Sequence, residues 1–166
     1  MKKIVSLLLF ISIVTTAMAQ NPLPIGRTQL NFGVGLSNWG IPVYIGLDYG
    51  VHKDISIGAE LSFRNYNEKW NNTVYRQQVM GFVGNANYHF NSIMNIPQTF
   101  DFYAGINIGF NAWNSPAGYG GDNTSGLALG GQIGGRLYVS KSVALNLEFM
   151  GGNGLSTGKF GLTLKL

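Results

Sequence analysis

The sequence contains no cysteine, only 5 prolines in 166 residues, and only 11% charged residues. Without cysteine, an N-terminal lipid anchor is excluded, and the length predicts one domain. An ordinary soluble domain carries about 25% charged residues. After the N-terminal segment there is no apolar run of 18 or more residues. A helical membrane protein is therefore excluded.

Glycine and aromatic residues are abundant instead, with 24 glycines and 13% aromatics. This mixture suits strands and tight turns and argues against disorder. Low charge without hydrophobic runs is typical of lipid-facing strands, because each such strand alternates apolar residues with small polar ones.

The first residues have the pattern of a secretory signal peptide. Lys2 and Lys3 form a basic start, an apolar stretch follows to Val14, and Ala17-Met18-Ala19 is a small-residue cleavage site. We therefore expect residues 1–19 to be removed and the mature chain to begin at Gln20. Removal lowers the formal charge from +4 to +2. We see no basic patch that would bind nucleic acid.

From Thr28 onward, apolar and polar residues alternate with the period of a β-strand, and turn residues separate the segments. Eight strands are expected, which fits the roughly 9–11 residues that a membrane strand requires. Their predicted ranges are 29–36, 43–49, 55–64, 79–89, 101–110, 126–139, 143–150 and 160–166.

The two faces of these strands differ in charge. One face is apolar and carries no charged residue, whereas every strand charge and most glycines fall on the other face. A Lys or Arg at the lipid midplane costs about 2–4 kcal/mol, so lipid demands such a charge-free face. The sequence therefore predicts an all-β, antiparallel, up-and-down, eight-stranded transmembrane barrel over residues 20–166, with small and charged residues filling a narrow lumen.

The connections predict the orientation. Residues 50–54 and 140–142 are short turns, whereas residues 65–73, 111–125 and 151–157 are long, polar or glycine-rich loops. Short connections face the periplasm and long ones face outside. Two connections fit less well, since 37–40 is short for an external loop and 91–99 is long for a periplasmic turn.

The aromatic residues fall where interface anchors are expected. Three tryptophans, Trp39, Trp70 and Trp113, lie in the predicted external loops. The aromatic residues at the strand ends are expected to form two girdles. The periplasmic girdle would contain Tyr49, Tyr88, Phe90, Phe100 and Phe102, and the outer girdle would contain Phe63, Phe110 and Phe149.

Two stretches resemble a known family. Asn87-Tyr88-His89-Phe90, and Gly135 to Ser140 running into Leu145-Asn146-Leu147-Glu148, are similar to small outer-membrane barrels of the OmpX and OmpA transmembrane-domain type. More particularly, the chain resembles the Bacteroidetes-like "outer membrane protein beta-barrel domain" proteins. The resemblance covers Gln20 to Leu166 and implies insertion by the barrel-assembly machinery. The family usually ends in an aromatic residue, whereas this chain ends in Leu166.

The charged lumen residues predict a polar network. The turn at 140–142 should pair Val139 with Val143, which places Arg136 opposite Asn146 and diagonal to Glu148. We expect Glu148 to contact Arg136 and Lys159, with Glu60 and Arg64 meeting the cluster across the lumen: Glu60, Arg64, Arg136, Glu148 and Lys159.

No catalytic, metal or cofactor motif is evident. The chain has only two histidines, His52 in a periplasmic turn and His89 at a periplasmic strand end. Outer-membrane enzymes that modify lipid A work toward the outer leaflet, so neither histidine is placed for that chemistry. We interpret His52 as a solvated residue, His89 as a hydrogen-bonded lumen residue, and Glu60 with Glu148 as ion-paired rather than as a general acid/base pair.

Three functions stay open. The first is a non-enzymatic barrel that contributes to envelope integrity or surface interaction through its loops. The alternatives are a lipid A-modifying enzyme and a narrow channel, and a soluble periplasmic ligand-binding barrel is more distant. The expected partners are outer-membrane lipid and lipopolysaccharide, with no cofactor and a monomeric state.

Overall fold

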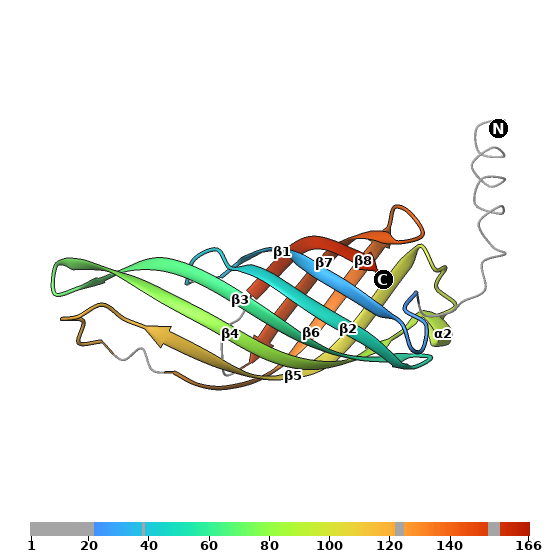
Figure 1. Ribbon diagram of the computed structural model, residues 1–166, viewed down its shortest axis with the longest axis horizontal. Helices are drawn as coiled ribbons and strands as arrows, with labels where there is room; N and C mark the ends of the chain where they lie inside the picture. The colour runs from blue at the N-terminus through green and yellow to red at the C-terminus, as the bar shows by residue number, and fades with distance from the viewer. Residues whose placement is uncertain (1–21, 38, 122–124, 153–156) are drawn as a thin grey trace, which may run out of the picture.

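A computed structural model describes residues 22–37, 39–121, 125–152 and 157–166, so the predicted signal peptide at 1–19 lies outside the described residues. Eight antiparallel strands form a closed barrel in which each strand pairs with its sequence neighbours and β8 pairs with β1 (Figure 1). The predicted fold is confirmed. The strands are β1 (Thr28–Leu36), β2 (Val43–His52), β3 (Ile55–Trp70), β4 (Thr73–His89), β5 (Phe100–Asn114), β6 (Gly126–Tyr138), β7 (Val143–Gly152) and β8 (Thr157–Lys165).

The barrel is inside-out compared with a soluble protein. Apolar side chains of the predicted lipid face point outward, and Ile106 and Leu127 are 72% and 71% exposed. Most side chains buried in the lumen are polar or charged. Such a continuous apolar exterior is stable only against lipid, which is why the alternation in the sequence identified the membrane strands.

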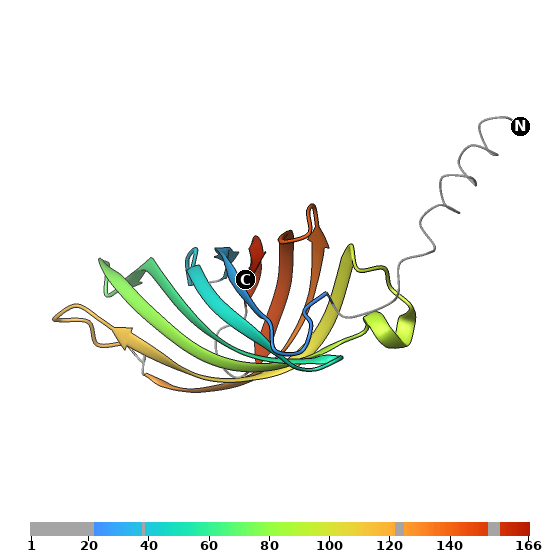
Figure 2. The same cartoon turned by 45° about the vertical axis from the view of Figure 1, so that its right-hand side comes forward.

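Both ends of the strand array lie at one end of the barrel. The amide of Leu166 donates to the carbonyl of Thr28 over 2.9 Å. The β2–β3 and β6–β7 turns close the same end, together with α2 (Asn91–Met94) in the connection before β5. Figure 2 shows α2 at the end opposite the β3–β4 hairpin. Among the described residues, no helix is long and apolar enough to cross a bilayer.

The β3–β4 hairpin corrects one prediction. Residues 65–73 were expected to form a loop, but β3 continues to Trp70, β4 begins at Thr73, and only Asn71 and Asn72 form the turn. Both turn residues have positive φ, 45° and 64°, as a tight two-residue hairpin turn requires. We call residues 65–78 the external arm; it extends beyond the other strands in Figure 1.

A segment before β1 closes back onto the end of the barrel that carries α2, which we predict to be the periplasmic end. The Gly26 amide donates to the Gly50 carbonyl over 2.8 Å, and the Gly50 amide donates to Arg27 over 3.0 Å. A side chain at Gly50 would collide with the carbonyl of Pro24, so only glycine permits this approach. Leu23 is fully buried as a result. This contact could not be predicted from the sequence, because Leu23 lies outside any alternating segment.

Candidate functional site: the polar lumen

The first group of charges lies toward the periplasmic end and centres on Arg136. Its guanidinium donates to Asp101 over 2.9 Å and to Asp48 over 2.8 Å. All three side chains are almost completely buried. The three residues come from β6, β5 and β2, so one arginine joins strands from opposite sides of the barrel. We call Asp48, Asp101 and Arg136 the periplasmic cluster.

Neutral side chains complete this cluster. Gln29 and Asn31 on β1 donate to the same oxygen of Asp48, over 3.0 and 2.9 Å. Tyr138 donates to Gln29 over 3.2 Å, and Thr163 donates to Asn31 over 2.7 Å. Hydrogen bonds to a buried carboxylate offset its loss of hydration. The network therefore holds a charge that would otherwise be costly in the lumen.

A Ser–His–Asp arrangement adjoins the periplasmic cluster. His89 Nδ1 lies 2.7 Å from Asp101, and His89 Nε2 lies 2.9 Å from the Ser56 hydroxyl oxygen. Asp101 favours a proton on Nδ1, which leaves Nε2 free to accept from Ser56. This is the bonding order of a serine hydrolase triad. His89 was predicted to lie in the lumen, but its two partners were not predicted, because they lie 33 and 12 residues away in the sequence.

The surroundings of this triad do not suit hydrolysis. Ser56, His89 and Asp101 are all 0% exposed, so no substrate reaches the hydroxyl in this structure. Ser56 is paired with Gly50 of β2 on one side and Asn87 of β4 on the other, so nearby amides donate within the sheet rather than to an oxyanion. Asp101 is also bound by Arg136. The arrangement is explained as part of the lumen packing.

The second group of charges centres on Lys159. Its ammonium contacts Glu60 of β3 and Glu148 of β7, each at 2.8 Å. The Tyr103 hydroxyl donates to the other oxygen of Glu148 over 2.8 Å. Glu60, Glu148 and Lys159 form what we call the central cluster, and these three predicted residues do come together.

Tyr103 connects the two clusters. Its ring lies under the Arg136 guanidinium, with 4.3 Å between the guanidinium carbon and the ring centroid. Its hydroxyl reaches Glu148. The side chain is 2% exposed, so it fills the lumen while offering a cation–π surface to one cluster and a donor to the other. Tyr103 was not among the residues predicted to form the lumen network.

One predicted contact is wrong. The register was predicted correctly, since Arg136 pairs with Asn146. However, Arg136 makes no ion pair with Glu148, because its side chain turns to Asp101, which lies directly across from it on β5. Glu148 is bound by Lys159 and Tyr103 instead. Arg136 therefore binds the carboxylate directly opposite it on β5, Asp101, rather than the diagonal carboxylate on β7, Glu148.

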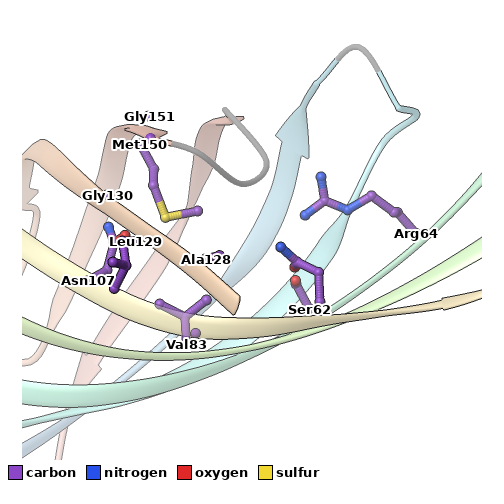
Figure 3. A pocket seen from close by; sticks show the side chains of 12 residues that line it. Ser62, Arg64, Val83, Asn107, Ala128, Leu129, Gly130, Met150 and Gly151 are labelled. Carbon is purple, nitrogen blue, oxygen red and sulfur yellow. The ribbon is translucent and has the colours of Figure 1, made fainter. Parts of the chain in front are cut away.

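Arg64 also stays outside the clusters. It lies toward the external end of β3, is 4% exposed, and donates to the Ser37 hydroxyl over 3.2 Å. No carboxylate among the described residues forms an ion pair with it. Figure 3 shows its side chain reaching into the lumen from one wall while Met150 reaches in from another.

The three tryptophans lie at the end of the barrel that carries the β3–β4 hairpin, but Trp70 ends β3 and Trp113 lies within β5, so these two are not in loops as predicted. Trp39 and Trp113 are in edge-to-face contact with centroids 6.2 Å apart, and the Trp113 indole donates to the Tyr66 hydroxyl over 3.4 Å. Trp70 contacts Tyr119 in the same manner at 5.9 Å. Trp39 and Trp70 are only 36% and 38% exposed. Aromatic residues thus pack on one another here instead of standing free in loops.

Comparisons with known proteins identify the fold. No family model matches the chain, and no curated protein matches it. Among solved structures, OprG of Pseudomonas aeruginosa is similar with a TM-score of 0.66 at 9% identity, covering 87% of this chain and 97% of that one. Neisserial surface protein A is similar with a TM-score of 0.56 at 15% identity, covering 84% and 94%.

A de novo designed transmembrane β-barrel is also similar, with a TM-score of 0.54 at 19% identity, covering 86% of this chain and 98% of the design. The chain therefore has the fold of the small eight-stranded outer-membrane barrels. Because a designed sequence adopts the same fold, the likeness alone carries no function. Any function must be argued from the lumen and the external end.

Proposed function

We propose that the chain is a non-enzymatic integral outer-membrane protein whose lumen is closed by buried charges and whose external end contributes to envelope integrity or surface interaction. The observation that carries this proposal is the pair of ion clusters joined by Tyr103, which extends across the lumen from β2 and β3 to β6, β7 and β8.

The order of charges along the lumen also supports a closed barrel. Lys165 lies near the periplasmic end, over the Tyr138 ring, and Arg64 lies near the external end. Between them, each cluster holds two carboxylates and one cation. A permeating cation would first meet a positive charge at either end, and an anion would meet surplus carboxylates inside. A continuous channel is therefore the weaker alternative.

The apolar exterior and the external arm supply the expected partners. The exterior suits membrane phospholipid and the acyl chains of lipopolysaccharide, and the barrel-assembly machinery would insert the chain during export. We expect a monomer, because the eight strands leave no unpaired sheet edge for a second copy.

Export and location can be tested together. The protein should fractionate with outer membranes, begin at Gln20 by N-terminal sequencing, and migrate faster on gels when unboiled, as closed barrels do. Recovery in the soluble periplasm, or an intact N-terminus at Met1, would contradict this part of the proposal.

The Ser–His–Asp bonding order suggests a second candidate function, a hydrolase, which the burial of all three residues opposes. We expect no labelling of Ser56 by a fluorophosphonate and no change in lipid A when the gene is deleted. A Ser56→Ala variant serves as the matched control for labelling. Covalent labelling that disappears in Ser56→Ala would establish an accessible nucleophile and overturn the non-enzymatic proposal.

The external role requires a surface assay. Replacing Trp39, Trp70 and Trp113 with alanine should reduce adhesion to surfaces or resistance to detergents, while Lys69→Gln, in the external arm beside Trp70, should not. Equal behaviour of wild type, triple variant and a deletion strain in both assays would remove the external-surface role.

A further inference from the structure

Among the described residues, Arg64 is the one almost completely buried cation without a carboxylate in contact. Arg136 and Lys159 each bind two carboxylates, whereas Arg64 has only the hydrogen bond to Ser37. Its Nε is buried without any partner. An unpaired buried cation is strongly destabilising, so this guanidinium favours an anion that the structure does not contain.

A cavity adjoins this guanidinium. It measures about 20 Å³ and lies within the lumen, on the external side of the central cluster. A buried water needs only about 10–15 Å³ of space, so the cavity has room for a small ion. Glycines make the room; its lining includes Gly109, Gly130, Gly151 and Gly152. Figure 3 shows Arg64 and Ser62 on one wall of this space and Met150 on another.

The polar groups around the cavity suit an anion better than a cation. Besides Arg64, the side chains of Ser62 and Asn111 line it and can donate hydrogen bonds. The Asn107 amide is already committed to Gln132 over 3.2 Å. No carboxylate lines the cavity. A cation would therefore meet a guanidinium without any negative ligand.

We propose that Arg64, Ser62 and Asn111 form a binding site for one small monovalent anion of the size of chloride in the external mouth of the lumen. We expect the confined space and the nearby Glu60 to favour such an ion over a larger, divalent oxyanion such as sulfate. Glu60 lies four residues before Arg64 on the same inward face. Lys159 forms ion pairs with both Glu60 and Glu148, so this cluster has one more negative than positive charge. The surplus negative charge of this cluster faces the site, so binding is weak and depends on contact with Arg64.

The site can be tested in purified barrel in detergent. The ³⁵Cl resonance should broaden with wild type, and thermal unfolding should shift upward with sodium chloride at an ionic strength held constant with sodium sulfate. Arg64→Met should abolish both effects. Arg76→Met, which removes an exposed arginine of the external arm, should leave both unchanged.

Two further variants make the result decisive. Ala128→Leu keeps Arg64 but fills the cavity from the opposite wall, so it should also abolish the ³⁵Cl broadening and the thermal shift. This variant tests the site independently if Arg64→Met does not fold. Glu60→Gln removes the negative charge that faces the site, while the ion pair of Lys159 with Glu148 remains. The chloride concentration that gives half of the full effect should therefore fall. Wild type that responds equally to chloride and sulfate, or a response that persists in Ala128→Leu, would overturn the proposal.

Discussion

The membrane-embedded barrel and the external arm use the same two strands, yet their faces carry opposite kinds of side chain. Within the barrel, β3 points Leu61 and Phe63 outward and Glu60 inward. Beyond Phe63, the same outward face carries polar residues such as Lys69, and the inward face carries Trp70. The backbone continues unchanged across this point, so the solvent outside decides which face is apolar.

We infer that this inversion marks the edge of the membrane. On β3 the outward face changes between Phe63 and Asn65, and on the paired strand it changes between Met80 and Gln78. These residues lie at the same level, because Phe63 pairs with Met80 and Asn65 pairs with Gln78. The arm is therefore a water-exposed hairpin whose aromatic inner face forms a small core of its own.

The largest expected difference between the two regions concerns arginines. Arg136→Met leaves Asp48 and Asp101 without their shared cation, at a cost of about 3–5 kcal/mol in unfolding free energy. Arg76→Met in the arm removes an exposed charge and should change stability by less than about 0.5 kcal/mol. Urea unfolding in lipid vesicles measures both. Similar losses for the two variants would contradict the buried cluster.

A charge on the outward face gives the second comparison. Ile106→Arg places a charge in lipid and should cost about 2–4 kcal/mol. Val74→Arg changes a residue that is also outward and 62% exposed, but it lies in the arm and should be tolerated within about 0.5 kcal/mol. If both substitutions proved equally harmful in the same unfolding assay, the arm would lie in lipid and the membrane edge would be misplaced.

How much the sequence revealed depends on the length of the connections. The three-residue turn at 140–142 fixed the β6–β7 register, so the pairing of Arg136 with Asn146 was predicted correctly. The β5–β6 register follows a long loop and could not be counted across it. The contact of Arg136 with Asp101 was missed for that reason, although both residues had been placed on the inward face.

The external arm was missed for a different reason. Its alternation persists, but its apolar residues occupy the face that is polar in the barrel. A search for one continuous apolar face therefore ends at Phe63 and treats the rest as a loop. Contacts across the lumen, such as Lys159 with Glu60 at 99 residues of separation, need the closed barrel before they can be assigned to particular pairs.

The smallest expected effect compares one contact from each region. A double-mutant cycle of Lys159→Met with Glu148→Gln should give a coupling of about 0.5–3 kcal/mol, because each side chain is the other's buried partner. A cycle of Trp70→Ala with Tyr119→Ala should give a smaller coupling free energy, at most about 1.5 kcal/mol. It is measured from the rates at which a protease cleaves the arm in the two single variants and the double variant. Additive behaviour of Lys159 and Glu148 would mean that the central cluster does not form.

Conductance across a planar lipid bilayer tests the closed lumen most directly. The account predicts that wild type inserts without stable conductance steps, whereas Tyr103→Ala, which removes the side chain joining the two clusters, gives detectable current. Insertion is verified in the same preparation by the gel shift between unboiled and boiled protein. Stable, reproducible single-channel steps from wild type would contradict the central claim that buried charges close this barrel.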